Sequence, residues 1–196
     1  MAMPDKLFYP FAVLLIAAMI VAALMAGGAS GGVDQPDVNP EVDGFTLEGD
    51  ALRALVPSPG TTVDYAQDQQ LTGEYAIAAA HMLRREAPPS AGVFAELGPI
   101  YEAAFGSKNL KITIRARSGR DRPAERFTVN YYSAGAGDSD PQIFTPTDEF
   151  QDFSFNFRPN APRGEPGTDF VGIWPDVAGK SGTIEIERIR VEIVSE

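Results

Sequence analysis

The sequence has 196 residues, of which 44% are hydrophobic and 22% are charged, and its formal net charge is −11. This length leaves room for one ordinary domain, and the acidity argues against a nucleic-acid partner, because nucleic-acid affinity comes mostly from lysines and arginines that neutralise phosphates. The absence of cysteine excludes disulfides, thiolate metal sites, cysteine nucleophiles and the lipid-modified cysteine of bacterial lipoproteins.

The first predicted element is a membrane-spanning helix. Residues Leu7–Ala26 form an uncharged apolar run long enough to cross a hydrocarbon core of about 30 Å. Lys6 precedes this run and no basic residue follows it until Arg53, so the positive-inside rule places residues 1–6 in the cytoplasm. We therefore expect a single-pass protein of the cytoplasmic (inner) membrane, with its helix in the lipid bilayer and its carboxy-terminal domain in the periplasm. A cleaved signal peptide is the alternative, since small residues follow at Gly27–Ala29, although its apolar region would normally be shorter.

A flexible linker is predicted over residues 27–43. It begins GGASGGVDQPDVNPE and holds almost nothing that could be buried, because glycine, serine, proline and acidic residues dominate it. Its acidic side chains would be repelled by anionic lipid, so we expect the domain to stand off from the membrane surface.

From residue 44 to residue 196 the sequence predicts short strands joined by turns. Apolar and polar residues alternate, and the breaks are rich in glycine, proline and aspartate, as the 19 glycines and 16 prolines of the chain also suggest. The three phenylalanines of Phe153–Phe157 stand at alternate positions and must share one face, which we expect to be core. The segments Lys111–Arg117 and Phe127–Tyr131 repeat this pattern.

The last strand, Ile184–Ile193, changes phase along its length. Its apolar residues fall on even positions as far as Ile186 and on odd positions from Ile189 onward. One extra residue at Glu187 or Arg188 would form a β-bulge and would keep both halves of the strand on the core side.

Two further segments have to be assigned before a fold class follows. Gly73–Ala87 has a helical composition but alternates, so we interpret it as a strand and keep a helix as the alternative. Gly98–Phe105 is predicted to be a short helix, because Pro99 suits a first helical position and Gly106 follows as a stop signal. About seven or eight short strands without a long helix predict an all-β fold, a jelly-roll β-sandwich of two antiparallel sheets.

The order of these segments resembles a known family. The runs NLKITIRAR, ERFTVNYYSAG, FTPTDEFQDFSFNFRP, TDFVGIWPDVAG and GTIEIERIRVEI are similar to the carbohydrate-binding modules of the galactose-binding-like jelly-roll superfamily. The resemblance covers about Lys108 to Ile193, and Thr147–Phe157 carries its clearest motif. It implies a sandwich fold, a binding function and a closing strand whose acids often help to hold a structural calcium ion. In this sequence Arg188 follows the acids Glu185 and Glu187, which departs from that pattern and leaves the calcium site open.

No catalytic or metal-binding constellation emerges from the sequence. His81 is the only histidine, and without cysteine it is better interpreted as a buried, hydrogen-bonded structural residue than as a metal ligand. The carboxylate pairs Asp138/Asp140 and Asp148/Glu149 lie in turn-like segments, where acids form turns and keep surfaces soluble. We therefore predict no catalytic residue, no metal and no cofactor.

Aromatic residues are the candidate ligand-binding groups, because sugar-binding proteins stack sugar rings on exposed aromatic side chains. Trp174 is the only tryptophan and follows a strand, so it is predicted to be either a platform at the rim or a plug that seals one end of the sandwich. Tyr131 and Tyr132 are adjacent, so one of them must face outward from a strand, and Tyr132 is the better exposed candidate.

A basic stripe is the last feature of the sequence. Seven of the 16 basic residues fall between Lys108 and Arg126 and could meet an anionic partner. The simpler interpretation is that the outward Lys111, Arg115 and Arg117 face Glu185 and Glu187 across the sheet.

Two functional hypotheses follow. The first is a membrane-anchored, non-enzymatic accessory or scaffolding protein, whose partners are membrane protein subunits that contact both its helix and its outer domain. The small residues of the helix would permit close packing against other transmembrane helices. The alternative is a membrane-held carbohydrate-binding module that recognises envelope or external polysaccharide.

Overall fold

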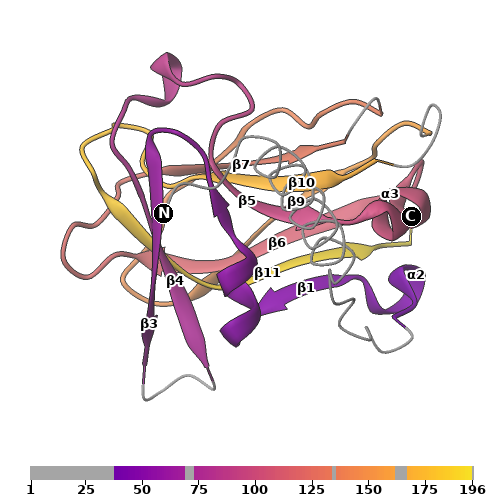
Figure 1. Ribbon diagram of the computed structural model, residues 1–196, viewed down its shortest axis with the longest axis horizontal. Helices are drawn as coiled ribbons and strands as arrows, with labels where there is room; N and C mark the ends of the chain where they lie inside the picture. The colour runs from indigo at the N-terminus through magenta and orange to yellow at the C-terminus, as the bar shows by residue number, and fades with distance from the viewer. Residues whose placement is uncertain (1–37, 69–72, 134–135, 162–166, 196) are drawn as a thin grey trace, which may run out of the picture. The chain divides into compact units, whose positions relative to one another are not determined.

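Two antiparallel sheets packed face to face form the fold (Figure 1). The computed structural model describes residues 38–68, 73–133, 136–161 and 167–195, and Asn39–Glu196 form one compact unit. The predicted membrane segment and most of the predicted linker lie outside the described residues, although the last four linker residues form the short helix α2 (Pro40–Asp43). Within the described part of the chain, no helix is both long enough and apolar enough to span a bilayer.

One sheet has six strands and is called the six-stranded sheet below. Its path is β3-β4-β11-β6-β9, and β1 pairs with the second half of β11, alongside the part that pairs with β4. The strands are β1 (Phe45–Glu48), β3 (Thr61–Gln67), β4 (Glu74–Ala80), β6 (Leu110–Ser118), β9 (Gln151–Phe157) and β11 (Thr183–Ile193).

The other sheet, the five-stranded sheet, follows the order β2-β5-β10-β7-β8. Its strands are β2 (Val56–Pro57), β5 (Val93–Leu97), β7 (Phe127–Tyr132), β8 (Gln142–Phe144) and β10 (Asp169–Trp174). The short helical elements that connect strands are η1 (Gly49–Ala54), η2 (Arg84–Glu86) and α3 (Pro99–Phe105). The all-β, two-sheet sandwich is therefore confirmed, with eleven strands where seven or eight were expected; the surplus includes the two- and three-residue edge strands β2 and β8.

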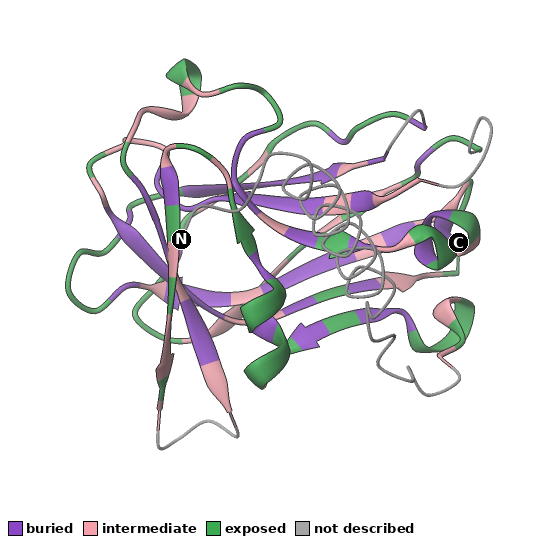
Figure 2. Ribbon diagram, viewed as in Figure 1, coloured by how far each residue is buried: buried purple, intermediate pink, exposed green. Residues whose placement is uncertain are grey.

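The core lies between the two sheets, where the inward side chains of both meet (Figure 2). The β6 isoleucines Ile112 and Ile114 are fully buried. Their neighbours on β9 face the same side, and the ring of Phe153 packs edge-on against that of Phe127 from the other sheet, with centroids 5.1 Å apart. The prediction that the phenylalanines of Phe153–Phe157 face the core is confirmed.

The predicted β-bulge on β11 is also present. The pairing of β11 with β6 shifts register between Ile186 and Arg188, so that Ile184 and Ile186 before the shift and Ile189 after it are all fully buried. A strand that must bury its apolar residues over eleven positions accommodates the change of phase by inserting one residue.

The two ambiguous segments adopt the predicted structures. Residues Glu74–Ala80 form strand β4, because its small side chains fit between the sheets, and tertiary packing overrides their helical propensity. The segment after β4 leaves the sheet and contains the turn η2. Helix α3 begins at Pro99 after an N-cap at Gly98 and ends before Gly106, as predicted.

Two arginines of the basic stripe, Arg115 and Arg117, are paired with acids on the outer face of the six-stranded sheet. Arg117 donates from its Nε to Glu185 at 2.6 Å, and its guanidinium lies 4.1 Å from the centre of the Phe150 ring. Arg115 forms the matching pair with Glu187 at 2.6 Å. Desolvation by burial acts against the charge of Arg117, yet its two acidic neighbours outweigh it and raise the pKa of the guanidinium. The interpretation that these basic residues face acids across the sheet is confirmed.

Candidate functional site

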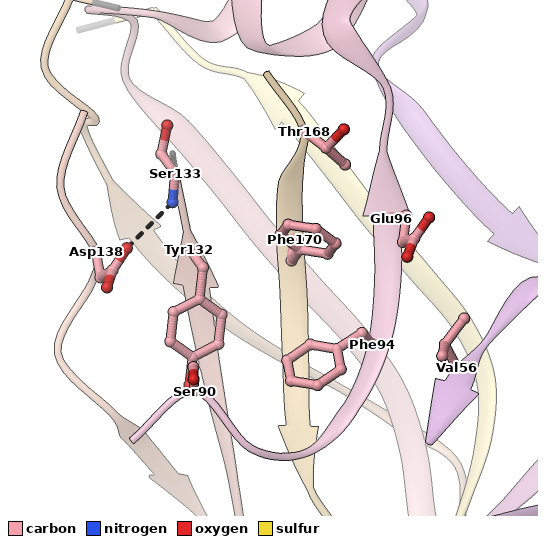
Figure 3. A pocket seen from close by; sticks show the side chains of 9 residues that line it. All are labelled: Val56, Ser90, Phe94, Glu96, Tyr132, Ser133, Asp138, Thr168 and Phe170. Carbon is pink, nitrogen blue, oxygen red and sulfur yellow. Dashed lines mark hydrogen bonds between the residues drawn. The ribbon is translucent and has the colours of Figure 1, made fainter. Parts of the chain in front are cut away.

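A groove crosses the outer face of the five-stranded sheet, the face turned away from the core (Figure 3). It encloses about 490 Å³ and is lined by residues from β2, β5, β7 and β10 and from the loops beside them. The lining residues are Val56, Ser90, Phe94, Glu96, Tyr132, Ser133, Asp138, Thr168 and Phe170.

The alternation of the strands explains why these residues are outside. On β5, Val93, Ala95 and Leu97 point inward and are fully buried, so Phe94 and Glu96 point outward. The same alternation on β10 places Val171 inward and leaves Phe170 on the outer face. Bulky aromatic residues therefore stand on a face that the core does not use.

The register of the sheet arranges the lining residues in two rows across the strands. In one row Glu96 lies beside Phe170 and Phe170 beside Tyr132. In the other row Val56 lies beside Phe94 and Phe94 beside Gly172. The rows cross β5 and β10 at right angles to the strands, so an elongated ligand would also lie across the strands.

Gly172 lies on β10 beneath two of the aromatic rings of the groove, and its lack of a side chain makes room for them. A Cβ atom at this position would lie 2.6 Å from Cε2 of Tyr132 and 2.9 Å from Cε1 of Phe94. The two rings therefore lean over the bare backbone of β10 and occupy the space above it. Phe94 packs edge-on against both other aromatic residues, with ring centroids 6.2 Å from Tyr132 and 6.1 Å from Phe170.

One wall of the groove is the segment 82–91, which follows β4 and contains η2. The hydroxyl of Tyr132 donates to the carbonyl of Pro89 at 2.7 Å, and Arg84 donates to the carbonyls of Pro88 at 2.9 Å and Pro89 at 2.6 Å. Burial raises the pKa of the Tyr132 phenol, with the Arg84 charge acting in the opposite direction. The hydroxyl therefore remains a donor, and it ties the segment to the sheet.

The other wall is formed at the ends of β7 and β10 by Ser133, Thr168 and Asp138. Oδ1 of Asp138 accepts a hydrogen bond from the backbone N–H of Ser133 at 3.2 Å, which Figure 3 shows as a dashed line. The Asp138 carboxylate is exposed, as is that of Glu96 across the groove. The groove thus combines aromatic surfaces with hydrogen-bond acceptors at its margins, a lining suited to a ligand with both apolar faces and hydroxyl groups.

Of the three aromatic residues predicted from sequence, only Tyr132 lines the groove. Tyr131 points into the core and is fully buried, where its hydroxyl donates to Oδ2 of Asp169 at 2.5 Å. Burial, reinforced by the Asp169 carboxylate, raises the pKa of the Tyr131 phenol far above its usual range. Adjacent residues of a strand face opposite sides, so Tyr131 cannot share the surface of Tyr132.

Of the two predictions for Trp174, the structure matches the plug and not the platform at the rim. Its position on β10 has the same parity as Phe170 and Gly172, yet only 1% of its surface is exposed, because segment 82–91 covers it. Its indole N–H donates to the carbonyl of Asp176 at 2.9 Å, and the Arg84 guanidinium lies 5.3 Å from its ring centre. In this structure the indole seals the sandwich and supports the groove wall.

His81 lies away from the groove, at a smaller hollow of about 270 Å³ on the six-stranded sheet. Its ring nitrogens are within hydrogen-bond distance of the hydroxyls of Thr62 and Ser181, at 3.2 and 2.9 Å. The predicted hydrogen bonding is present, but the side chain is exposed, because β4 ends before His81 and the chain turns into solvent. Among the described residues, no three histidine or acidic side chains are grouped so that they could hold a metal ion.

Phe94, Phe170 and Glu96 were not predicted as site residues. The signal was present in VFAEL and DFVGIW, where Phe94 and Phe170 alternate with buried aliphatic residues and therefore had to be on the outer face.

No protein-family model matches the sequence, and no curated protein matches it. Solved structures, in contrast, do match it. The C-terminal family 22 carbohydrate-binding module of Clostridium thermocellum Xyn10B superposes with a TM-score of 0.55 at 12% identity, covering 83% of this chain and 100% of the module.

Two further matches belong to the same family of modules. The xylan-binding domain of Xyn10C from Paenibacillus barcinonensis gives a TM-score of 0.51 at 8% identity, covering 78% of this chain and 94% of that domain. A two-module piece of the Clostridium thermocellum xylanase, complexed with xylohexaose, gives 0.54 at 9% identity, covering 76% of this chain and 28% of that protein. At these identities the likeness shows the fold alone: the described domain is a jelly-roll β-sandwich of the kind found in carbohydrate-binding modules.

Proposed function

We propose that this chain is a non-enzymatic protein that binds a polysaccharide chain in the groove of the five-stranded sheet. The observation that carries the proposal is a group of three uncovered aromatic residues, called the aromatic row below although it spans both rows of the sheet. Phe94, Phe170 and Tyr132 are only half-buried in a groove of about 490 Å³. A sugar ring has apolar C–H faces and hydroxyl edges, so aromatic rings on the floor and carboxylates at the margins match both.

The likeness of fold supports the same proposal. In the module from Clostridium thermocellum Xyn10B, amino acids in the cleft have a role in ligand binding. A shared fold does not itself transfer a ligand, because one fold hosts many functions. The groove residues of this chain therefore have to be tested directly.

The geometry of the rings favours a single soluble chain over a flat crystalline surface. Phe94 makes angles of 63° and 76° with the rings of Tyr132 and Phe170, so the three rings do not form one plane. A groove with tilted walls encloses a chain, whereas a crystalline polymer face needs a flat platform.

The test is titration calorimetry of the full chain in mild uncharged detergent against a panel of soluble oligosaccharides. Phe170→Ala removes one aromatic ring from the floor of the groove and is expected to weaken binding at least about tenfold, since an anchoring aromatic contact contributes about 1.4 kcal/mol or more. Ile143→Ala, an exposed aliphatic residue on β8 that does not line the groove, is the matched control and should bind as the wild type does. Equal loss in both variants, or no binding to any glycan, would refute the proposal.

The membrane anchor at Leu7–Ala26 and the periplasmic location remain part of the proposal. They rest on the length and charge flanks of that apolar run. An anchored module would hold its glycan near the cell envelope. Membrane fractionation of the full chain, with the accessibility of its carboxy-terminal domain to external protease, tests both.

The accessory or scaffolding hypothesis makes a separate prediction. A domain that docks on membrane subunits should co-purify with them after mild detergent extraction, and native mass analysis would detect the assembly. A strictly monomeric chain that binds glycan would favour polysaccharide recognition over scaffolding.

A further inference from the structure

The charged groups of the groove are all acidic. Glu96 lies on the side of β5 and Asp138 on the far side of β7, so the two carboxylates flank the aromatic row from opposite ends (Figure 3). Of the described residues that line the groove, none is lysine, arginine or histidine. The whole chain is also acidic, with a net charge of −11.

These two carboxylates are not neutralised by the protein. Across the described ranges, neither Glu96 nor Asp138 forms an ion pair, whereas the acids on the opposite sheet, Glu185 and Glu187, each pair with an arginine. A carboxylate left exposed and unpaired at a groove margin is available to a ligand.

The nearest cation belongs to the groove wall. Arg84 is close enough to Tyr132 for its charge to act against the rise in the phenol pKa. Its guanidinium donates to the carbonyls of Pro88 and Pro89 and lies over the Trp174 ring. Arg84 therefore holds segment 82–91 in place, and it is not among the residues that line the groove.

The aromatic row adds to the preference for positive charge. The faces of phenylalanine and tyrosine rings carry negative potential and attract ammonium groups that come close to them. With Phe94, Phe170 and Tyr132 between two carboxylates, the ring faces and the charged side chains that line the groove both favour a cation.

We propose that the groove discriminates by charge and prefers a glycan whose residues carry protonated amino groups, a deacetylated amino-sugar chain, over a neutral glycan, and rejects uronic acid chains. This inference rests on the proposed polysaccharide-binding function. Each ammonium that reaches an exposed carboxylate strengthens binding about threefold, so the pair gives a preference of about tenfold over the neutral chain of equal length.

A basic peptide would have the same charge, but the groove fits it less well. A peptide that binds as an added strand needs a free strand edge, whereas β5, β10 and β7 are each paired on both sides. The groove lies on the face of the sheet, where a chain that brings its own hydroxyl and amino donors is favoured.

The experiment compares hexamers of β-1,4-linked glucosamine, N-acetylglucosamine, glucose and glucuronic acid, with hexalysine as the peptide probe. Binding to the full chain in uncharged detergent is measured by titration calorimetry at about pH 5.5, where most sugar amines carry a proton and exposed carboxylates are ionised. The glucosamine hexamer should bind about tenfold more tightly than the glucose hexamer, and the glucuronate hexamer should not bind. The preference should shrink as salt is added, because exposed charges are screened.

The variant pair Glu96→Gln and Asp138→Asn, made together, should remove the preference, so that the glucosamine and glucose hexamers bind with equal affinity. Asparagine at 138 retains the Oδ1 acceptor for Ser133, so the loop remains anchored. Removing two exposed acids outside the groove, Asp121→Asn and Glu125→Gln, is the matched control and should retain most of the preference.

The possible failures are distinguishable. Equal affinity for the glucosamine and glucose hexamers, or a preference that survives in the groove variant, overturns the charge inference and leaves polysaccharide binding intact. Hexalysine binding more tightly than any glycan overturns it in favour of a peptide ligand. If none of the hexamers binds, the proposed function itself fails.

Discussion

Replacing Gly172 by alanine tests the groove without changing any residue that would contact a ligand through its side chain. The new Cβ would lie 2.6 Å from the Tyr132 ring and 2.9 Å from the Phe94 ring, whereas ordinary contacts begin near 3.4 Å. The Tyr132 edge must therefore retreat by about 0.8 Å. That shift widens the floor and disturbs the hydrogen bond from Tyr132 to Pro89.

The magnitude follows from what moves. Overpacking in a closed core costs about 1–3 kcal/mol, but these rings are half-exposed and can tilt outward, so we expect the lower end, about 1 kcal/mol. For a domain of this size that lowers Tm by about 2–4 °C. Ligand affinity should fall more, by about tenfold or more, because the displaced rings are the binding surface itself.

Gly98→Ala is the matched control for this substitution. Gly98 is the N-cap of α3 with φ −61°, and a Cβ there meets nothing within 4 Å. Thermal unfolding and glycan calorimetry of both variants should show a loss of affinity in Gly172→Ala alone. If Gly172→Ala binds glycan as the wild type does, the space between Phe94 and Tyr132 is not the binding site.

Three further substitutions test the supports of the groove and the core. Tyr131→Phe removes the buried hydrogen bond to Asp169 and should cost about 1–3 kcal/mol in urea unfolding at neutral pH. The pKa of Tyr131 is raised in the folded state, so the stability that its protonated phenol contributes is present below pH about 10. At higher pH this stability falls by up to about 1.4 kcal/mol per pH unit. The Tyr131→Phe variant should lack that loss. Asp176→Asn replaces a buried carboxylate that accepts three backbone N–H groups in the β10–β11 loop, so thermal unfolding should show a loss of about 2–3 kcal/mol. Arg84→Ala should loosen segment 82–91, and acrylamide should then quench the fluorescence of Trp174, the only tryptophan, more strongly than in the wild type.

Local alternation made much of the fold predictable. A strand that buries one face must alternate, so the pattern of Lys111–Arg117 gave the inward isoleucines, and the phase change in Ile184–Ile193 gave the bulge. The ion pairs of Arg115 and Arg117 followed from the same alternation, because acids and bases occupied the outward positions of two strands. Short edge strands such as β2 (Val56–Pro57) were missed, because two residues carry no period.

The site was less predictable, because the exposure of a side chain on the outer face depends on which distant segments of the chain cover it. Sequence parity placed Tyr132 on the outer face and Tyr131 on the inner face, which the structure reproduces. Trp174 occupies an outward position of β10, like Phe170 and Gly172, but segment 82–91 from elsewhere in the chain covers it. The residues next to Trp174 in the sequence do not encode this cover. They therefore could not show whether the indole is buried or exposed.

The contrast between Trp174 and its neighbours on the same face is an argument for function. Segment 82–91 buries the indole almost completely, with Ala80 and Ala91 packed beside it, yet ends at the margin of the row that contains Phe94, Phe170 and Tyr132. Large exposed apolar side chains are a liability for solubility, and the fold already has the means to cover them. A sheet face that is covered at one end and left as an aromatic groove at the other supports the proposal that a ligand provides the missing cover.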